Sequence, residues 1–353
     1  MAQLMIYGAN GYTGRLIARE AVRRGLTPVL AGRSREGIAQ LADELGLQQR
    51  VFGLAKGEEI ERNLDGIGIV LHCAGPFSQT AAPMLDACLN CNVHYLDITG
   101  EIDVFALCHR ADDRAIEAGI VVLPGSGFDV VPTDCLAAML KRRLPDATSL
   151  VLGFEAGGGP SPGTAKTSVE GMGRGGRARI NGEVTDVPLA WKSREFVRDD
   201  GKARSAMTIP WGDVFTSFVS TGIANVETYM VVPPKTIKRL TWMRHLQPVL
   251  KMGFVQNFMK RQVERNTPGP SQQRRQDSGC YVWGEVRNAA GKEARLALAA
   301  PNGYDLTVTA SLGIAQRLLE QAQPPQGGYY TPSLLMGADY VTTLPGVRLI
   351  EAT

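Results

Sequence analysis

Over the first 125 residues, short apolar runs alternate with segments whose apolar residues recur at helical spacing. The apolar runs cover residues 4–7, 28–31, 67–71, 93–98 and 120–123, and the helical segments cover 15–24, 36–45, 80–90 and 104–118. Strands that alternate with helices of this length are typical of βαβ units, in which right-handed crossovers join parallel strands. The pattern therefore predicts an α/β fold with a doubly wound parallel sheet of the Rossmann type.

The alternation ends at PGSGFDVVPTD (124–134). Beyond it, several strand-like segments follow one another without regular helices between them, and two of them flank a turn at Ala290-Gly291. This favours a second, α+β domain with a mixed sheet. We expect the Rossmann domain to span 1–127 with C-terminal elements of about 301–353 returning to it. The second domain, for substrate binding or oligomerisation, would span 128–300.

Composition narrows the class of protein. A chain of 353 residues with 44% hydrophobic and 21% charged residues predicts a globular protein with more than one core. The net charge of +3 is too small to favour nucleic acid as a partner. No apolar run reaches about 18 residues, so no membrane-spanning helix is expected. Six scattered cysteines and no recognisable secretory signal favour a cytoplasmic location. The pair in CLNC (88–91) has no second pair at zinc spacing, so no metal site is predicted.

The first strand is followed by GANGYTG, which places Gly8, Gly11 and Gly14 where the strand turns into a helix. Gly8 permits a sharp turn, Gly11 permits backbone N–H groups to approach a pyrophosphate, and Gly14 permits close helix–sheet packing. The positive end of the following helix then faces the phosphates. The motif and its strand–helix context together predict a dinucleotide site.

The end of the second strand indicates which dinucleotide is bound. NAD-binding domains carry an acid there for the ribose hydroxyls, whereas an arginine accommodates the 2′-phosphate of NADP. This chain has Arg33, Ser34 and Arg35 at that position. Two guanidinium groups and a hydroxyl suit a dianionic phosphate, so we predict NADP(H). The alternative is a pair of solvated surface arginines.

Extended short-chain dehydrogenases share the glycine spacing but need Tyr and Lys four residues apart, and none of the nine tyrosines is followed by Lys at that distance. A different series of motifs runs in order from residue 8 to residue 341: GANGYTG, AGRS, HCAGPFSQTAAPMLDACLNCNVHYLDITGE, PGSGFDVVPTD, GTAKTS and GGYYTPSLLMGADYV. In this combination the chain resembles the saccharopine dehydrogenase-like reductases, a family that includes trans-acting enoyl reductases. The resemblance implies a fold and a hydride donor more firmly than a reaction.

The resemblance also implies site residues. The pyrophosphate would be cradled by Gly8, Ala9, Asn10, Gly11, Tyr12, Thr13 and Gly14, and the 2′-phosphate held by Arg33, Ser34 and Arg35. The nicotinamide side would be lined by Ala74, Gly75, Pro76 and Phe77, with Ser126, Gly127 and Phe128 at the start of the second domain. The candidate catalytic residues are Asp97, Glu101, Asp129 and Lys166. A carboxyl group could relay the proton that hydride delivery requires, although Asp97 and Asp129 could equally cap turns, and Lys166 could be a surface lysine.

Two enzyme classes and one binding role remain open. An opine-type imine (C=N) reductase would need arginines for two substrate carboxylates, and Arg174, Arg177 and Arg179 are available. The basic, apolar segment 236–262 would instead suit an acyl chain on an acidic carrier protein or a membrane surface, although a helix pair that covers the second sheet is the simpler interpretation. The balance favours reduction of an activated C=C in a lipid- or polyketide-type substrate. A non-catalytic NADPH-binding scaffold is the third possibility. The late segment GGYYTPSLLMGADYV could form a homodimer interface or close the Rossmann core.

Overall fold

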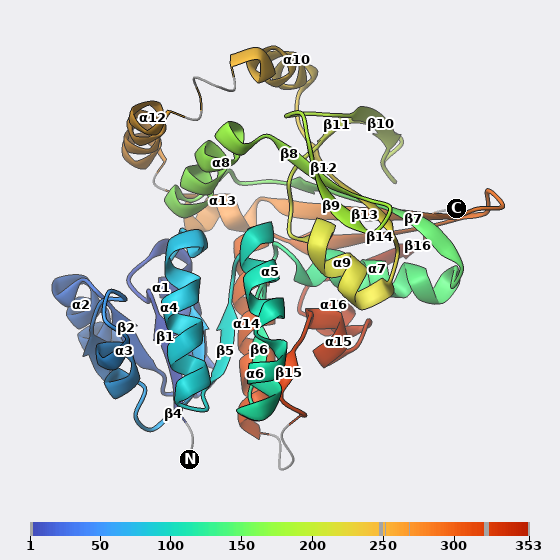
Figure 1. Cartoon of the computed structure of the whole chain (residues 1–353). Helices are drawn as coiled ribbons and strands as arrows, with labels where there is room; N and C mark the ends of the chain where they lie inside the picture. The colour runs from blue at the N-terminus through green and yellow to red at the C-terminus, as the bar shows by residue number, and fades with distance from the viewer. Residues whose placement is uncertain (1–2, 247–249, 251, 268, 321–324, 352–353) are drawn as a thin grey trace. The chain divides into compact units, whose positions relative to one another are not determined.

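The computed structural model describes residues 3–246, 250, 252–267, 269–320 and 325–351 (Figure 1). The chain divides into two compact units. The first unit comprises residues 1–131 and 304–336, and the second comprises 132–303 and 337–353. The chain therefore crosses between the units more than once.

The first unit is built on a seven-stranded sheet in the order β15-β6-β5-β4-β1-β2-β3, in which every neighbouring pair is parallel. Its strands are β1 (Gln3–Tyr7), β2 (Val29–Gly32), β3 (Gln49–Val51), β4 (Ile67–His72), β5 (His94–Asp97), β6 (Val121–Leu123) and β15 (Gly328–Tyr329). The central strands are buried along almost their whole length because helices pack on both faces. This confirms the predicted Rossmann architecture. The prediction missed β3, a short edge strand without a buried residue.

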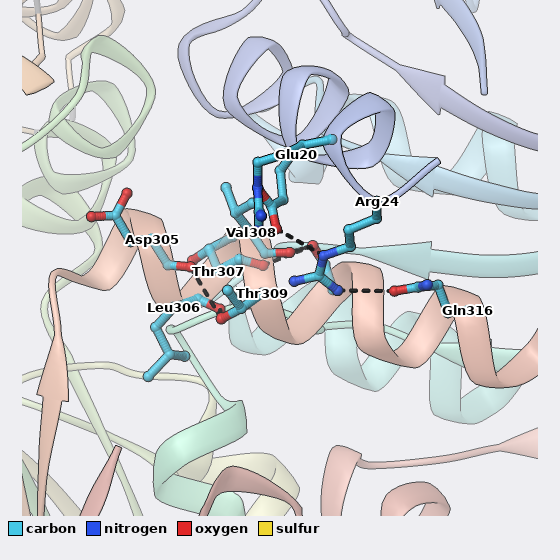
Figure 2. A network of polar contacts seen from close by, with 10 residues as sticks. Glu20, Arg24, Asp305, Leu306, Thr307, Val308, Thr309 and Gln316 are labelled. Carbon is cyan, nitrogen blue, oxygen red and sulfur yellow. Dashed lines mark hydrogen bonds and ion pairs between the residues drawn. The ribbon is translucent and has the colours of Figure 1, made fainter. Parts of the chain in front are cut away.

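The helices of this unit are α1 (Tyr12–Arg23), α2 (Arg35–Leu45), α3 (Gly57–Asn63), α4 (Phe77–Asn90), α5 (Ile102–Arg110), α6 (Asp112–Glu117), α14 (Gly303–Glu320) and α15 (Pro332–Met336). Polar contacts join the late helix α14 to α1 (Figure 2). Arg24 Nε donates to Glu20 Oε1 at 2.8 Å, and Arg24 Nη1 donates to Gln316 Oε1 at 2.9 Å. These side chains hold the returning segment against the first helix of the unit.

The second unit carries a mixed sheet in the order β10-β11-β12-β7-β13-β14-β16, with β8 and β9 attached at β12. Its strands are β7 (Ala147–Ala156), β8 (Gly176–Ile180), β9 (Glu183–Val187), β10 (Ser193–Val197), β11 (Ala203–Thr208), β12 (Asn225–Val231), β13 (Gly279–Asn288), β14 (Glu293–Pro301) and β16 (Arg348–Glu351). Only β12 and β7 pair in parallel within the seven-strand path. The predicted mixed sheet and the β13–β14 hairpin are confirmed.

The C-terminal segment divides between the two units. Strand β15 extends the first sheet beside β6, whereas β16 pairs with β14 in the second sheet. The expectation that 301–353 returns as a whole to the first domain is therefore wrong for β16. Its sequence, Arg-Leu-Ile-Glu, has two apolar residues between two exposed charged ones and suits an edge strand, and β14 offers the free edge.

The helices of the second unit are α7 (Val131–Arg143), α8 (Pro162–Arg174), α9 (Asp213–Thr221), α10 (Pro234–Met243), the 3-10 turn η1 (Arg244–Leu246), α12 (Gly253–Asn266), α13 (Gln272–Gln276) and α16 (Tyr340–Thr343). The simpler interpretation of 236–262, a helix pair that covers the second sheet, describes only part of the segment. Helix α10 contacts β11, and its Ile237, Leu240 and Met243 are partly buried. Helix α10 has no buried residue, and Phe254 in α12 is 71% exposed. Across the described parts of the chain, no helix combines the length and apolarity needed to cross a bilayer.

Candidate cofactor and catalytic site

The glycine turn between β1 and α1 leaves no room for side chains. Gly8 has a φ of +82°, and its N–H donates to the Ala31 carbonyl at the end of β2 at 2.7 Å. A Cβ on Gly8 would lie 2.8 Å from the Ala74 nitrogen, and a Cβ on Gly14 would lie 2.3 Å from the Gly8 oxygen. Both positions therefore require glycine, because a Cβ there would overlap backbone atoms.

Helix α1 begins beside this turn without a side-chain cap. Its N-cap residue, Gly11, is exposed, and its first turn contains no acid. Arg15 Nε donates to the Asn10 carbonyl at 2.9 Å, and the Tyr12 ring packs edge-on against Tyr304 at 5.0 Å. The helix thus presents its positive end beside a turn that is kept tight by glycine, which fits a pyrophosphate.

Arg33, Ser34 and Arg35 follow β2 at the same edge of the sheet, and all three are exposed. Neither guanidinium group makes a hydrogen bond or ion pair within the described part of the chain. The Ser34 hydroxyl caps α2 by accepting a bond from the Gly37 N–H at 3.4 Å. The two arginines fit a phosphate, whereas the serine has a local structural role as well.

The turn after β4 is held by a buried histidine that the sequence analysis did not assign to the site. His72 is fully buried, and burial lowers its pKa to about 3, so the ring is neutral. Thr80 Oγ1 donates to the Ala74 carbonyl at 2.7 Å and lies 3.0 Å from His72 Nε2. Because the hydroxyl has one proton to donate, we assign the histidine proton to Nε2. The hydrogen bonds from His72 to Thr80 and from Thr80 to Ala74 fix the Ala74–Phe77 turn. In the sequence, the sign of this role is a polar histidine at the end of an apolar strand.

Glu101 caps the helix that begins at this turn. Its Oε1 accepts from the Phe77 N–H and its Oε2 from the Ser78 N–H, both at 2.9 Å. The side chain is 8% exposed. A carboxylate at a helix N-terminus is stabilised by the N–H groups and by the helix dipole. Glu101 therefore positions the Phe77 side of the turn, with both of its oxygens engaged.

Asp97 connects the ends of β5 and β6. Its Oδ1 accepts from the N–H groups of Thr99 at 3.0 Å and Gly125 at 2.8 Å, and its Oδ2 accepts from the Tyr95 hydroxyl at 2.7 Å. The Asp97 carbonyl also accepts from the Ser126 N–H and hydroxyl, both at 2.7 Å. Burial raises the pKa of Asp97 to about 6 against the lowering effect of these bonds. The hydrogen bonds of Asp97 thus hold the segments after β5 and β6 together at the sheet edge.

The predicted residues Ser126, Gly127 and Phe128 are buried. Phe128 N–H donates to Thr307 Oγ1 in α14 at 2.9 Å, and a Cβ on Gly127 would lie 2.7 Å from Thr307 Cγ2. This segment is therefore packed against the returning helix α14.

Asp129 differs from the other two acids. It is partly buried and packs over Gly100, where a Cβ would lie 3.0 Å from Asp129 Oδ2. Burial, and to a lesser extent the charge of Glu101, raises the pKa of Asp129 to about 7. No hydrogen bond occupies its carboxyl group within the described residues. It is thus the acid at this edge that can hold and release a proton near neutral pH.

The fourth catalytic candidate, Lys166, lies in α8 of the second unit, and its side chain lies outside the described part of the structure. The described residues include no group of three His, Cys, Asp or Glu side chains that could hold a metal ion.

The fold and the glycine turn define the first unit as a dinucleotide-binding domain of the Rossmann class. Residues 4–123 match the family model described as the saccharopine dehydrogenase NADP binding domain. NADP(H) is accordingly the cofactor of this domain, as the arginines after β2 predicted, and the resemblance drawn from the motifs is confirmed.

Comparisons with whole relatives give the same family. The saccharopine dehydrogenase-like oxidoreductase of Rattus norvegicus is 26% identical over 213 residues, which cover 52% of this chain and 49% of the rat protein. The trans-acting enoyl reductase of Mycobacterium bovis (strain BCG / Pasteur 1173P2) is 28% identical over 151 residues, which cover 40% of this chain and 35% of that protein. The chain thus matches about half or less of the length of these relatives.

A solved structure extends the likeness to the whole fold. The apo saccharopine dehydrogenase (L-Glu forming) of Saccharomyces cerevisiae superposes with a TM-score of 0.63 at 9% identity. The superposition covers 99% of this chain and 100% of that one. At this identity the likeness shows the fold and carries no information on the substrate.

Proposed function

We propose that this chain is an NADPH-dependent reductase of an activated C=C bond in an acyl substrate. When bound, NADPH supplies a hydride to one alkene carbon, while a proton is added to the neighbouring carbon to give the saturated acyl product and NADP⁺. The chain's own residues must therefore bind the dinucleotide, orient the substrate and deliver one proton.

The cofactor contacts follow from the sheet edge. The turn from Gly8 to Gly14 would cradle the pyrophosphate, and Arg33 and Arg35 would grip the 2′-phosphate with Ser34 between them. The turn from Ala74 to Phe77 would line the nicotinamide side, with Ser126, Gly127 and Phe128 just before the chain enters the second unit. The tight contacts at Gly8 and Gly14 support this assignment because they bring the backbone of the turn close to the start of α1.

Asp129 is the proton donor in this proposal. A general acid works best when its pKa lies near the operating pH, and the pKa of Asp129 is raised to about 7. Asp97 and Glu101 act as positioning residues, since backbone N–H groups engage their carboxylates. Lys166 remains a second candidate for polarising the substrate.

The preference for a C=C over a C=N substrate rests on Arg177 and Arg179 of the second unit. An imine reductase for amino-acid substrates needs guanidinium groups for two carboxylates. Arg177 Nε instead contacts Asp186 Oδ1 at 3.2 Å. Arg179 is 6% exposed, donates from Nε to the Val214 carbonyl at 2.8 Å and lies 4.3 Å from the centre of the Phe218 ring. The name of the mycobacterial relative supports the same choice and an acyl substrate held by a carrier protein.

The cysteines support a location in the reducing cytoplasm. All six are free thiols: Cys73, Cys88, Cys91, Cys108, Cys135 and Cys280. The homodimer suggested by the late apolar segment remains a prediction.

The test is NADPH oxidation with two matched substrate pools, trans-2-enoyl thioesters of increasing chain length and 2-oxo acids mixed with amino acids. We expect turnover with the thioesters and a saturated product by mass spectrometry. Asp129→Asn should lower kcat by about a hundredfold, as loss of a general acid does, whereas Asp43→Asn on the exposed surface of α2 should not. Turnover with the oxo acid and amine pool alone would contradict the proposal, and turnover with neither would favour a binding role.

A further inference from the structure

The second unit contains a long segment without acids. Residues 228–263 include no Asp or Glu, and the next acid is Glu264. The segment carries seven basic residues: Lys235, Lys238, Arg239, Arg244, Lys251, Lys260 and Arg261. Over the whole chain, 38 basic residues face 35 acidic ones, so this local excess is not a reflection of composition. The segment is a concentrated positive region on a nearly neutral protein.

Helix α10 exposes a cationic face that ends in an aromatic residue. Lys235, Lys238, Arg239 and Trp242 are all exposed, and their spacing of three and four residues places them on one side of the helix. Trp242 is 64% exposed, whereas Ile237 on the other side is partly buried. The helix therefore presents its largest apolar side chain to solvent together with its charges.

Helix α12 also exposes aromatic side chains, while Val255 and Met259 are partly buried. Phe254 and Phe258, one turn apart, are 71% and 63% exposed, and Arg261 continues their face. The polar Gln256 points toward the protein, where its Nε2 donates to the Leu250 carbonyl at 2.6 Å and to the Val169 carbonyl in α8 at 3.2 Å. Figure 1 shows α12 beside α8, with α10 at the margin of the unit. An amphipathic helix normally buries its aromatic residues, so this orientation calls for an external apolar phase.

We propose that the two exposed aromatic–basic helix faces dock on the surface of an anionic lipid bilayer. They comprise Trp242 with Lys235, Lys238 and Arg239 on α10, and Phe254 and Phe258 with Arg261 on α12. Aromatic side chains enter the headgroup boundary while lysine and arginine pair with lipid phosphates. The helices have 10 and 14 residues, too few to span the roughly 20-residue thickness of a bilayer, so they would lie on the surface.

The positive charge of these helices and the separation of their aromatic side chains favour a bilayer over a protein as the partner. A two-fold contact between two copies of the chain would bring the same basic face against itself, and like charges would repel. A protein partner needs one continuous complementary surface, whereas a bilayer accepts aromatic side chains from separate helices one by one. This docking surface is independent of the proposed reductase activity.

The test is co-sedimentation of the full chain with vesicles of phosphatidylcholine, with and without about 30% phosphatidylserine, at about 0.1 M and 0.5 M salt. We expect partitioning onto the anionic vesicles at least about tenfold stronger than onto neutral ones, and a marked loss at the higher salt. Equal partitioning onto both vesicles, or none onto either, would overturn the proposal.

A double variant, Phe254→Ser with Phe258→Ser, should lower partitioning at least about tenfold because the inserting side chains are removed. The matched control is Val197→Ser on β10, which removes another exposed apolar side chain, 69% exposed, and should have no effect. Unchanged NADPH affinity would show that the double variant is folded. Partitioning of the double variant equal to that of the wild type would overturn the proposal. So would a vesicle-free oligomer, or capture of an acidic acyl carrier protein, that the double variant loses.

Discussion

Two regions of the same sheet edge carry the candidate site, and they are built in opposite ways. At the ends of β1 and β2, the turn from Gly8 to Gly14 is shaped by the absence of side chains. At the ends of β5 and β6, three acids crowd together, and each carboxyl group has a different environment. We propose that the first region binds the cofactor through its tight glycine turn and the positive end of α1. The second region would move a proton through Asp129, the acid that has no hydrogen bond within the described residues.

Steric contact restricts the residues of the glycine turn, whereas hydrogen bonding distinguishes the acids at the ends of β5 and β6. A residue larger than glycine at position 14 would clash with backbone atoms, which cannot turn aside. Asp97 and Asp129, by contrast, are the same residue type at the same edge. Their roles differ because N–H groups reach Asp97 and none within the described residues reaches Asp129.

The largest expected effect lies in the glycine turn. Gly14→Ala would place a Cβ 2.3 Å from the Gly8 oxygen and 2.8 Å from Ala9 Cα, so the backbone must shift. We expect about 3 kcal/mol of destabilisation in urea unfolding, together with loss of NADPH binding. Gly53→Ala is the matched control, because its Cβ would meet nothing within 4 Å. Equal losses in the two variants would mean that the turn is not under steric constraint.

The second expected effect is a pH dependence of folding stability that comes from Asp129. Folded Asp129 keeps its proton up to about pH 7, whereas an unfolded aspartate releases it near about pH 4. The folded state therefore holds more protons between these values, so the stabilising contribution is full below about pH 4 and is lost as pH rises through 7. About three pH units separate these two pKa values, at about 1.4 kcal/mol each. The stability of Asp129→Asn relative to the wild type should therefore rise by up to about 4 kcal/mol between about pH 4 and pH 8.

Chemical unfolding across this pH range measures the effect, with Asp43→Asn as the exposed control. A stability difference between wild type and Asp129→Asn that does not change with pH would place Asp129 in an ordinary solvated environment. The comparison between the three acids would then fail.

Glu101 sharpens the distinction between positioning and proton transfer. Glu101→Gln keeps one acceptor oxygen but loses the charge that caps α4, so we expect about 1.5 kcal/mol of destabilisation. The pH dependence of kcat should keep its shape, since Asp129 supplies the proton. Glu117→Gln, at the exposed end of α6, should change neither quantity. A larger loss of kcat in Glu101→Gln than in Asp129→Asn would reverse the two roles.

The tight glycine turn could be predicted from the sequence because its signal is local, and the role of Arg33 and Arg35 stays a prediction from an equally local signal. A glycine at the strand–helix junction reports a steric limit a few residues away, and the pattern of alternating strands fixes which edge it occupies. The sequence could not separate the three acids, since hydrogen bonds from Phe77 and Gly125 come from distant parts of the chain. The same limit hid His72, whose partner Thr80 lies on the next helix.

Periodicity predicted least about which side of the helices in 236–262 is exposed. Spacing showed that apolar residues share faces of a helix, and burial on the second sheet was the simpler expectation. The structure instead turns Phe254 and Phe258 outward and Gln256 inward. Periodicity gives the face of a helix and does not say whether protein or another phase covers it.

The central claim is that the open turn and Arg33 together select NADPH. The most direct test is a fluorescence titration of wild type, Arg33→Ala and the exposed control Arg62→Ala with NADPH and NADH side by side. The account predicts that wild type and Arg62→Ala prefer NADPH by at least about tenfold, or roughly 1.4 kcal/mol, and that Arg33→Ala loses most of this preference. Equal affinity of the wild type for the two dinucleotides, or an unchanged preference in Arg33→Ala, would contradict it.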